Sequence, residues 1–381
     1  MATVSTAAAG EYLALATDSG QCYRYHAVWL RDNAPDPQTR SAGNGQRLIT
    51  LADIAPQTSI EHAEINAAEL LVTFAPEQKT VRYAIDWLET HAYDREHTRT
   101  PGWTSDSIET WDASLTAQLP VADYDALATD MTARRHWLQQ LSRFGFAKVV
   151  AGPIEDQALM RIVDWFGYVR ETNYGRHFEV RTEVNPSNLA FTGLGLQAHT
   201  DNPYRDPIPT LQLLYCLEAS ADGGDSMVVD GFRAARQLQQ ENPAWFDLLS
   251  RYCARFEYAG SDGVQLQSRR PIIELAPDGE LLAVRFNNRS AAAVTDVPFN
   301  SMPQYYAATR RLGEIIEAEN MQVTFKLQPG DSFIVDNTRV LHARKAYSGT
   351  GTRWLQGCYA DKDSMLSTLR SLEAETKNIL E

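Results

Sequence analysis

Two histidines and an aspartate, widely separated in the sequence, limit most strongly how this chain can fold. His199 and Asp201 stand two residues apart, and on an extended strand such residues point to the same face. His342 lies 143 residues beyond His199 (342 − 199). If all three side chains bind one metal ion, the fold must bring two distant strands together. Two histidines and one carboxylate form the triad of non-haem Fe(II) oxygenases, although a His-x-Asp tripeptide also occurs by chance as an ordinary hydrogen-bonded pair.

Composition and charge exclude several classes of protein. The 381 residues, of which 44% are hydrophobic, are enough for one large domain and a smaller one. A net charge of −14 argues against nucleic-acid binding, which requires a basic surface. The four cysteines are scattered and form no Cys-x-x-Cys pair, so neither a disulfide framework nor a zinc knuckle is indicated. No signal peptide and no membrane-spanning apolar run is indicated, and we expect a cytoplasmic protein.

The chain reads as short strands with helices between them. Residues 1–95 predict a small β-rich domain, and residues 96–122, which are polar and rich in Pro, Thr and Asp, predict a linker. Residues 123–381 alternate short apolar runs with helical segments. This mainly β pattern with helical insertions is typical of a β-barrel or jelly-roll core.

Arg353 and Ser226 follow the triad residues at sequence separations that suggest a second binding role. Arg353 follows His342 by 11 residues (353 − 342), and Ser226 follows His199 by 27 (226 − 199). A guanidinium group binds a carboxylate through two parallel hydrogen bonds. An arginine and a hydroxyl that converge on a metal pocket would therefore hold a dicarboxylate.

These motifs together resemble a known enzyme family. The spacing His-x-Asp, His, Arg is similar to that of the 2-oxoglutarate-dependent oxygenases of the taurine dioxygenase type. Further segments resemble the γ-butyrobetaine and trimethyllysine hydroxylase branch of that family and cover nearly the whole chain: 29–33, 188–191, 199–203, 223–232, 285–288 and 357–361. The resemblance implies a double-stranded β-helix (jelly-roll) catalytic domain that follows a small N-terminal domain.

The resemblance also implies cofactors and chemistry. His199, Asp201 and His342 would hold Fe(II), while Arg353 and Ser226 would hold the distal carboxylate of 2-oxoglutarate. Consumption of 2-oxoglutarate and O2 would release succinate and CO2 and hydroxylate a substrate, with ascorbate as a stimulant. A homodimer is the oligomeric state that the family implies.

The expected substrate is a small zwitterion with a trimethylammonium group. Aromatic rings attract such a cation, and the residues that match cage positions are Tyr174, Phe178, Phe191 and Tyr359. Asn188 and Tyr204 complete the predicted substrate site. For each ring, the alternative is an ordinary place in the hydrophobic core.

The chain departs from the branch at two places. The butyrobetaine hydroxylases carry zinc-binding cysteines after the segment 29–33, whereas residues 34–39 here contain none, so we expect no zinc. Asn202, Asn287 or Asn288, and Arg289 offer extra donors and a cation, unless Arg289 simply points to solvent. Such donors suit an anion larger than a carboxylate.

We therefore expect hydroxylation of 2-(trimethylamino)ethylphosphonate at the carbon that bears phosphorus, in phosphonate degradation. The first alternative is γ-butyrobetaine hydroxylation in carnitine biosynthesis. A weaker alternative, from another class, is a non-catalytic protein that binds quaternary ammonium compounds. Consumption of 2-oxoglutarate in the presence of iron would separate an enzyme from a binding protein.

Overall fold

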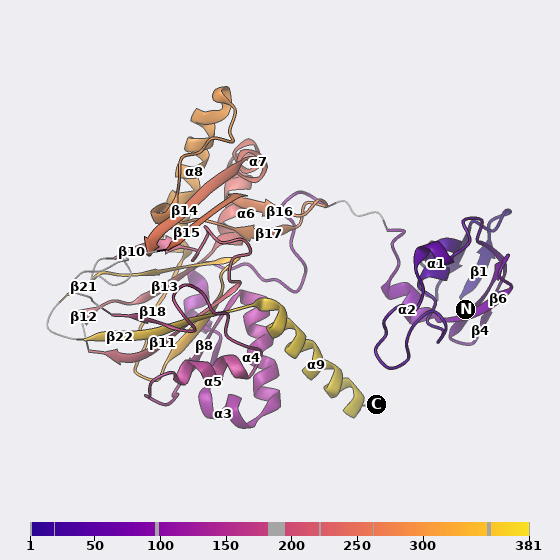
Figure 1. Ribbon diagram of the computed structural model, residues 1–381, viewed down its shortest axis with the longest axis horizontal. Helices are drawn as coiled ribbons and strands as arrows, with labels where there is room; N and C mark the ends of the chain where they lie inside the picture. The colour runs from indigo at the N-terminus through magenta and orange to yellow at the C-terminus, as the bar shows by residue number, and fades with distance from the viewer. Residues whose placement is uncertain are drawn as a thin grey trace. The chain divides into compact units, whose positions relative to one another are not determined.

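The computed structural model divides the chain into two compact units, Met1–Thr98 and Arg99–Glu381 (Figure 1). The residues that it describes are 2–18, 20–95, 99–181, 195–220, 222–261, 263–348 and 352–380. Among the helices of these residues, none is both long and apolar enough to cross a membrane.

Two antiparallel sheets of three strands each build the N-terminal unit. Side chains alternate between buried and exposed, as in β5, where Leu70, Val72 and Phe74 are buried, because successive residues of a strand point to opposite faces. Both sheets contribute to one hydrophobic core. The elements are β1 (Thr3–Thr6), β2 (Tyr12–Ala16), β3 (Cys22–His26), α1 (Ala27–Asp32), β4 (Ser59–Asn66), β5 (Glu69–Ala75), β6 (Lys79–Ala84) and α2 (Ile85–Thr90).

The loop after α1, where related enzymes were expected to bind zinc, is held by polar side chains. The buried Arg31 donates through Nε to Glu77 at 2.7 Å and through Nη1 to Thr39 at 2.9 Å. Asp36 forms an ion pair with Lys79 at 2.8 Å. These bonds fix Thr39 and Asp36 of the loop against α1 and β6.

Two sheets form the jelly-roll core of the second unit, as expected. One has the strand order β7-β8-β19-β11-β22-β9, and the other has the order β10-β20-β13-β18. Apolar side chains such as Phe146, Val228 and Phe333 fill the space between them. The strands are β7 (Val121–Asp123), β8 (Phe146–Val150), β9 (Phe178–Val180), β10 (Leu196–His199), β11 (Leu211–Ala219), β13 (Ser226–Asp230), β18 (Gln322–Phe325), β19 (Ser332–Asp336), β20 (Val340–Arg344) and β22 (Arg353–Ala360).

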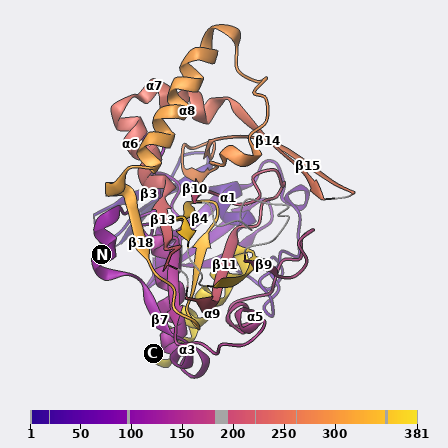
Figure 2. The same ribbon diagram turned by 90° about the vertical axis from the view of Figure 1, so that its left-hand side faces the viewer.

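Helices cover the outer faces of both sheets (Figures 1 and 2). α4, α5 and α9 pack on the six-stranded sheet, and α6, α7 and α8 share a core with β13 and β20. Polar caps fix where several helices begin, because a side chain that accepts from the first free N–H groups stabilises the first turn: Asp130 accepts from Thr132, and Asp230 from Phe232. The helices are α3 (Tyr124–Thr129), α4 (Met131–Phe144), α5 (Ala158–Asp164), α6 (Gly231–Glu241), α7 (Pro243–Arg251), α8 (Met302–Ile316) and α9 (Lys362–Leu380).

Among the described residues of the second unit, three pairs of strands lie outside the two main sheets. The longest is the hairpin of β14 (Cys253–Ser261) and β15 (Val264–Pro271), followed by that of β16 (Ile273–Leu275) and β17 (Leu281–Val284). The third pair is β12 (Asp222–Gly223) with β21 (Tyr347–Ser348). Short 3-10 turns occur at Leu51–Asp53, Ala113–Gln118, Asn288–Ser290, Phe299–Ser301 and Glu319–Met321.

The expected linker at 96–122 is wrong for residues 99–122, which belong to the second unit. Trp111 is 5% exposed, and its indole Nε1 donates to the carbonyl of Phe144 at 2.7 Å. Its backbone N–H donates to Asp230. The polar composition misled because this segment folds through specific side-chain bonds rather than through regular secondary structure.

A buried ion pair joins this segment to the jelly roll. Asp230 and Arg339 are 0% and 1% exposed, and Arg339 Nη2 lies 2.8 Å from Asp230 Oδ2. Arg339 also donates to the carbonyls of Arg143 and Glu109. Both charged side chains are removed from water, so each charge depends on the other.

Replacing Arg339 with Met should therefore destabilise the second unit strongly. The variant leaves the Asp230 carboxylate buried without its partner, which costs about 3–5 kcal/mol. Urea unfolding measures the loss. The control is Arg233→Met. Arg233 is 40% exposed, and its Nη2 lies 3.8 Å from Oδ2 of Asp112; an exposed ion pair of this kind contributes about 1 kcal/mol or less to stability. Equal stability of the two variants would contradict this role for the ion pair.

Candidate metal centre and substrate pocket

Strand alternation collects the candidate site residues inside the jelly roll. On β22, Arg353, Leu355 and Tyr359 occupy every second or fourth position and so share a face. Strand pairing then sets neighbours side by side. His199 on β10 is opposite His342 on β20, Ser226 on β13 is opposite Arg344, and Gln212 on β11 is opposite Tyr359.

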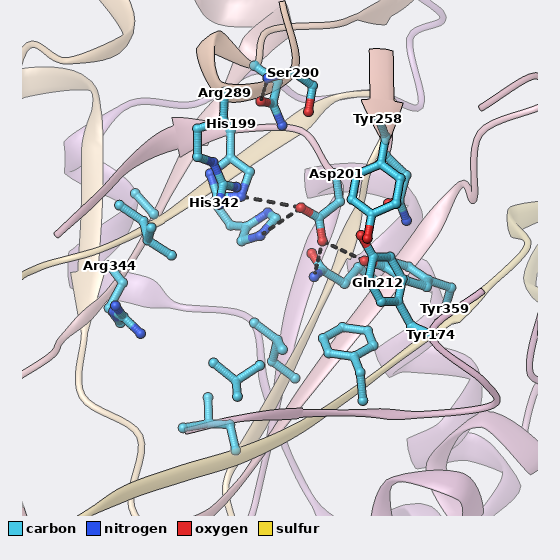
Figure 3. A pocket seen from close by; sticks show the side chains of 18 of the residues that line it. Tyr174, His199, Asp201, Gln212, Tyr258, Arg289, Ser290, His342, Arg344 and Tyr359 are labelled. Carbon is cyan, nitrogen blue, oxygen red and sulfur yellow. Dashed lines mark hydrogen bonds and ion pairs between the residues drawn. The ribbon is translucent and has the colours of Figure 1, made fainter. Parts of the chain in front are cut away.

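His199, Asp201 and His342 converge as the sequence predicted (Figure 3). The Nε2 atoms of His199 and His342 lie 3.3 and 3.9 Å from Oδ1 of Asp201. One potential ligand atom from each of the three residues lies within 4.8 Å of the others. One metal ion can therefore contact all three residues from one side.

The chemistry of these groups fits a divalent metal. Nδ1 of His199 lies 2.7 Å from the carbonyl of Gln197; a proton on Nδ1 leaves the lone pair on Nε2, where a metal would bind. Burial, together with the neighbouring His199, lowers the pKa of His342 to about 3, so its imidazole is neutral. Neutral imidazole is the form that ligates metals.

Asp201 is held by three residues that the sequence reading missed or assigned differently. Gln212 Nε2 and the Tyr359 hydroxyl both donate to Oδ2, at 2.6 and 2.8 Å. The buried Asn337 accepts from the backbone N–H of Asp201 at 2.7 Å and donates to its carbonyl at 2.9 Å. Oδ1 is left facing the histidines. Such support fixes the orientation of a metal-binding carboxylate.

The triad opens into a cavity of about 390 Å³, a size typical of small-molecule sites. Most of the residues predicted from the sequence to bind metal, cosubstrate or substrate line this cavity. Those in its lining are Tyr174, Phe178, His199, Asp201, Asn202, Tyr204, Ser226, Asn287, Arg289, His342, Arg353 and Tyr359. Arg344 also lines it. The predicted Asn188 and Phe191 lie outside the described residues.

Aromatic rings form one wall of this cavity. Phe178 lies 5.2 Å from Tyr359 between ring centroids, and Tyr204 lies 5.0 Å from Tyr258. Tyr174 is about equally far from both pairs, with centroid distances of 6.2 Å to Phe178 and 6.0 Å to Tyr258. A cation in this part of the cavity would contact several π faces.

The asparagines near Arg289 behave differently from one another. Asn288 is exposed and donates to Gln197, and it is absent from the cavity lining described above. Asn287 lines the cavity, but its amide donates to the carbonyl of Thr200 and accepts from Ser290. The prediction that Asn287 or Asn288 donates to the substrate is therefore wrong for Asn288. Asn287 stabilises the cavity wall through its bonds to Thr200 and Ser290.

Asn202 keeps a donor that lacks a partner. Its backbone is in the left-handed region at φ 51°, a conformation that asparagine tolerates. Its Oδ1 accepts from the Tyr204 hydroxyl at 2.6 Å, while the buried Nδ2 finds no hydrogen-bond partner within the described ranges. A buried donor without a partner costs about 1–3 kcal/mol, so this amide favours an acceptor from a ligand.

The sequence held weak signals for the missed residues. Gln212 is a polar residue in the apolar run 211–215, and strand alternation turns it to the interior of the jelly roll. Asn337 stands in the turn before the strand of His342. Tyr258 lies on a hairpin strand that no motif marked.

Comparisons with known proteins agree with this geometry. The profile of the family "Taurine catabolism dioxygenase TauD, TfdA family" matches residues 113–359. The chain belongs to this family. A second profile, "Gamma-butyrobetaine hydroxylase-like, N-terminal", matches residues 4–89.

Full-length relatives fall in the expected branch. The gamma-butyrobetaine dioxygenases of Homo sapiens and of Pseudomonas sp. (strain AK-1) are each 31% identical to the chain, with 93% of the chain and 92% of the relative covered. The mitochondrial trimethyllysine dioxygenase of Rattus norvegicus is 30% identical, with 92% of the chain and 83% of the relative covered. The protein is a dioxygenase of the iron- and 2-oxoglutarate-dependent type, and its His-Asp-His triad fits the iron.

Removing one ligand of the triad should abolish iron binding. His199→Ala and Asp201→Ala each leave two of three protein ligands, so Fe(II) retained after anaerobic gel filtration should fall from about one equivalent to near zero. His62→Ala, a change at an exposed histidine, is the control. The same metal analysis should find no stoichiometric zinc, since residues 34–47 contain no cysteine. Full iron retention in either triad variant would overturn the assignment.

Arg353→Ala should weaken 2-oxoglutarate binding. Loss of a charge-assisted bond to a carboxylate costs a few kcal/mol, so the KM for 2-oxoglutarate should rise on the order of a hundredfold. Steady-state kinetics measure it. The matched variant is Arg344→Ala, since both arginines line the cavity. An unchanged KM in Arg353→Ala with a large increase in Arg344→Ala would assign this role to Arg344 instead.

Proposed function

We propose that the protein hydroxylates 2-(trimethylamino)ethylphosphonate at the carbon that bears phosphorus, with release of succinate and CO2. The observation that carries this proposal is the lining of one cavity by an aromatic wall, a cationic group and the metal triad. A zwitterion that spans the wall and Arg289 would pass the triad. The relatives that act on gamma-butyrobetaine or trimethyllysine by name support a trimethylammonium substrate.

The residues around the triad have separable tasks in this proposal. His199, Asp201 and His342 would hold Fe(II), and Arg353 with Ser226 would hold 2-oxoglutarate. When bound, the iron and 2-oxoglutarate supply the oxidising chemistry with O2. Burial and the Asp201 carboxylate raise the pKa of the Tyr359 hydroxyl well above its usual range. Tyr359 therefore keeps its proton and continues to donate to Asp201.

The assignment of the anionic end of the substrate rests on two donors. Arg289 and the unpartnered Nδ2 of Asn202 both line the cavity. A phosphonate offers three oxygens and more than one negative charge near neutral pH, much as a phosphate monoester does, whereas a carboxylate offers two oxygens and one charge. The alternative substrate is γ-butyrobetaine, the compound for which two of the relatives are named.

Phe178→Leu should weaken the trimethylammonium site while it preserves the fold. The change keeps an apolar side chain of moderate size but removes the π face, which is worth about 1–2 kcal/mol to a desolvated cation. The KM for the trimethylammonium substrate should rise roughly five- to thirtyfold. The KM for 2-oxoglutarate is the internal control and should stay the same. An equal rise in both constants would indicate a general loss of the cavity.

The ratio of activities on the two candidate substrates tests the anion assignment. The wild-type enzyme should have a higher kcat/KM for 2-(trimethylamino)ethylphosphonate than for γ-butyrobetaine, because a smaller anion leaves the buried Nδ2 of Asn202 unpaired at about 1–3 kcal/mol and offers less charge to the exposed Arg289. Arg289→Ala should lower the phosphonate value far more than the butyrobetaine value.

Arg269→Ala is the matched control, because Arg269 is 60% exposed and pairs with Asp296. It should leave both values unchanged. A wild-type preference for γ-butyrobetaine, or an unchanged ratio in Arg289→Ala, would replace the phosphonate with the carboxylate as substrate. If neither compound stimulated iron-dependent loss of 2-oxoglutarate, the non-catalytic alternative would be favoured.

A further inference from the structure

A second cavity lies next to the wall that closes the metal pocket. Its volume is about 400 Å³, close to the 390 Å³ of the metal pocket. It is lined by α8, by the start of β14 and by residues 285–294. Asn287 lines both cavities, so the segment around it separates them.

The second cavity borders buried polar groups that lack partners. Tyr305 is 2% exposed and Arg285 is 8% exposed, and both line the cavity. Within the described residues, the Tyr305 hydroxyl and Nε of Arg285 have no hydrogen-bond partner. Arg285 uses its Nη1 for Glu274. Two buried donors without acceptors are costly, and an acceptor-bearing ligand would satisfy them.

The remaining lining defines the rest of such a ligand. Phe256, Phe286 and Val294 present apolar surface. Arg310 lies at an exposed position of the lining and forms no ion pair in the part of the chain that the structure describes. The apolar surface requires a hydrophobic body, and the arginines complement a negative charge.

We propose that this cavity binds a small organic anion with an apolar body, such as an aromatic or alkyl carboxylate or sulfonate. The anionic group lies toward Tyr305 and Arg285, and the apolar body packs between α8 and β14. The site is separate from the one that takes the substrate, and it does not depend on the identity of that substrate.

The wall between the cavities links this site to the metal centre. Phe286 accepts from Thr200 N–H at 2.9 Å and donates to its hydroxyl at 3.2 Å. Asn287 donates to the carbonyl of Thr200 at 2.9 Å. Thr200 stands between His199 and Asp201. A ligand against Phe286 would therefore contact a residue that is hydrogen-bonded to the segment between two of the three metal ligands.

Binding of 1-anilinonaphthalene-8-sulfonate, an aromatic sulfonate whose fluorescence rises in apolar sites, tests the proposal on the full-length protein. Thr309→Phe places a ring in the cavity from α8 and should abolish saturable binding. Tyr305→Phe removes one unsatisfied donor and should weaken binding roughly tenfold, while thermal stability without the probe stays the same or rises.

Arg310→Ala should weaken binding about threefold, and the adjacent Arg311→Ala should not, because Arg311 is outside the described lining and pairs with Glu241. Saturating Mn(II), 2-oxoglutarate and γ-butyrobetaine together should leave the probe bound. Unchanged binding in both Thr309→Phe and Tyr305→Phe, or displacement by the three active-site ligands, would overturn the proposal. Dissociation of an oligomer in Thr309→Phe would also overturn it, since a second copy of the chain would then occupy the cavity.

Discussion

One carboxylate, that of Asp201, is the group on which the metal centre depends. Its two oxygens have different partners. Gln212 and Tyr359 donate to Oδ2, while Oδ1 faces the Nε2 atoms of both histidines. If the donors to Oδ2 were lost, the carboxylate could rotate and present either oxygen to a metal. The hydrogen bonds therefore decide the geometry of the triad before any ion binds.

The jelly roll supplies those partners through strand pairing. Gln212 and Tyr359 are opposite each other on β11 and β22, and His342 is opposite His199 on the other sheet. Asn337 clamps the backbone of Asp201 from the turn that leads into β20. Strand pairing within each sheet, together with the turn before β20, thus brings together residues that are 136 to 147 positions apart (337 − 201 and 359 − 212).

Much of the site could be predicted from the sequence, because its chemistry follows a spacing rule. The period of two in a strand predicted that His199 and Asp201 share a face. In the structure β10 ends at His199, and Asp201 follows in a bend, from which its carboxylate still reaches both imidazoles. The same rule could not identify Asn337, whose role depends on the path of a turn. It also could not reveal that Trp111 is buried, since that segment is polar and has little regular structure. The structural role of Asn287 could not be predicted, because its amide donates to the carbonyl of Thr200, and no sequence pattern marks such a tertiary contact.

The central claim is that this protein couples 2-oxoglutarate oxidation to hydroxylation of a trimethylammonium compound. Turnover of 2-(trimethylamino)ethylphosphonate under ¹⁸O2, followed by mass spectrometry of both products, tests it most directly. The account predicts equal amounts of succinate and hydroxylated product, with one labelled oxygen atom in each. Succinate formed without a hydroxylated trimethylammonium product, from this compound or from γ-butyrobetaine, would contradict it.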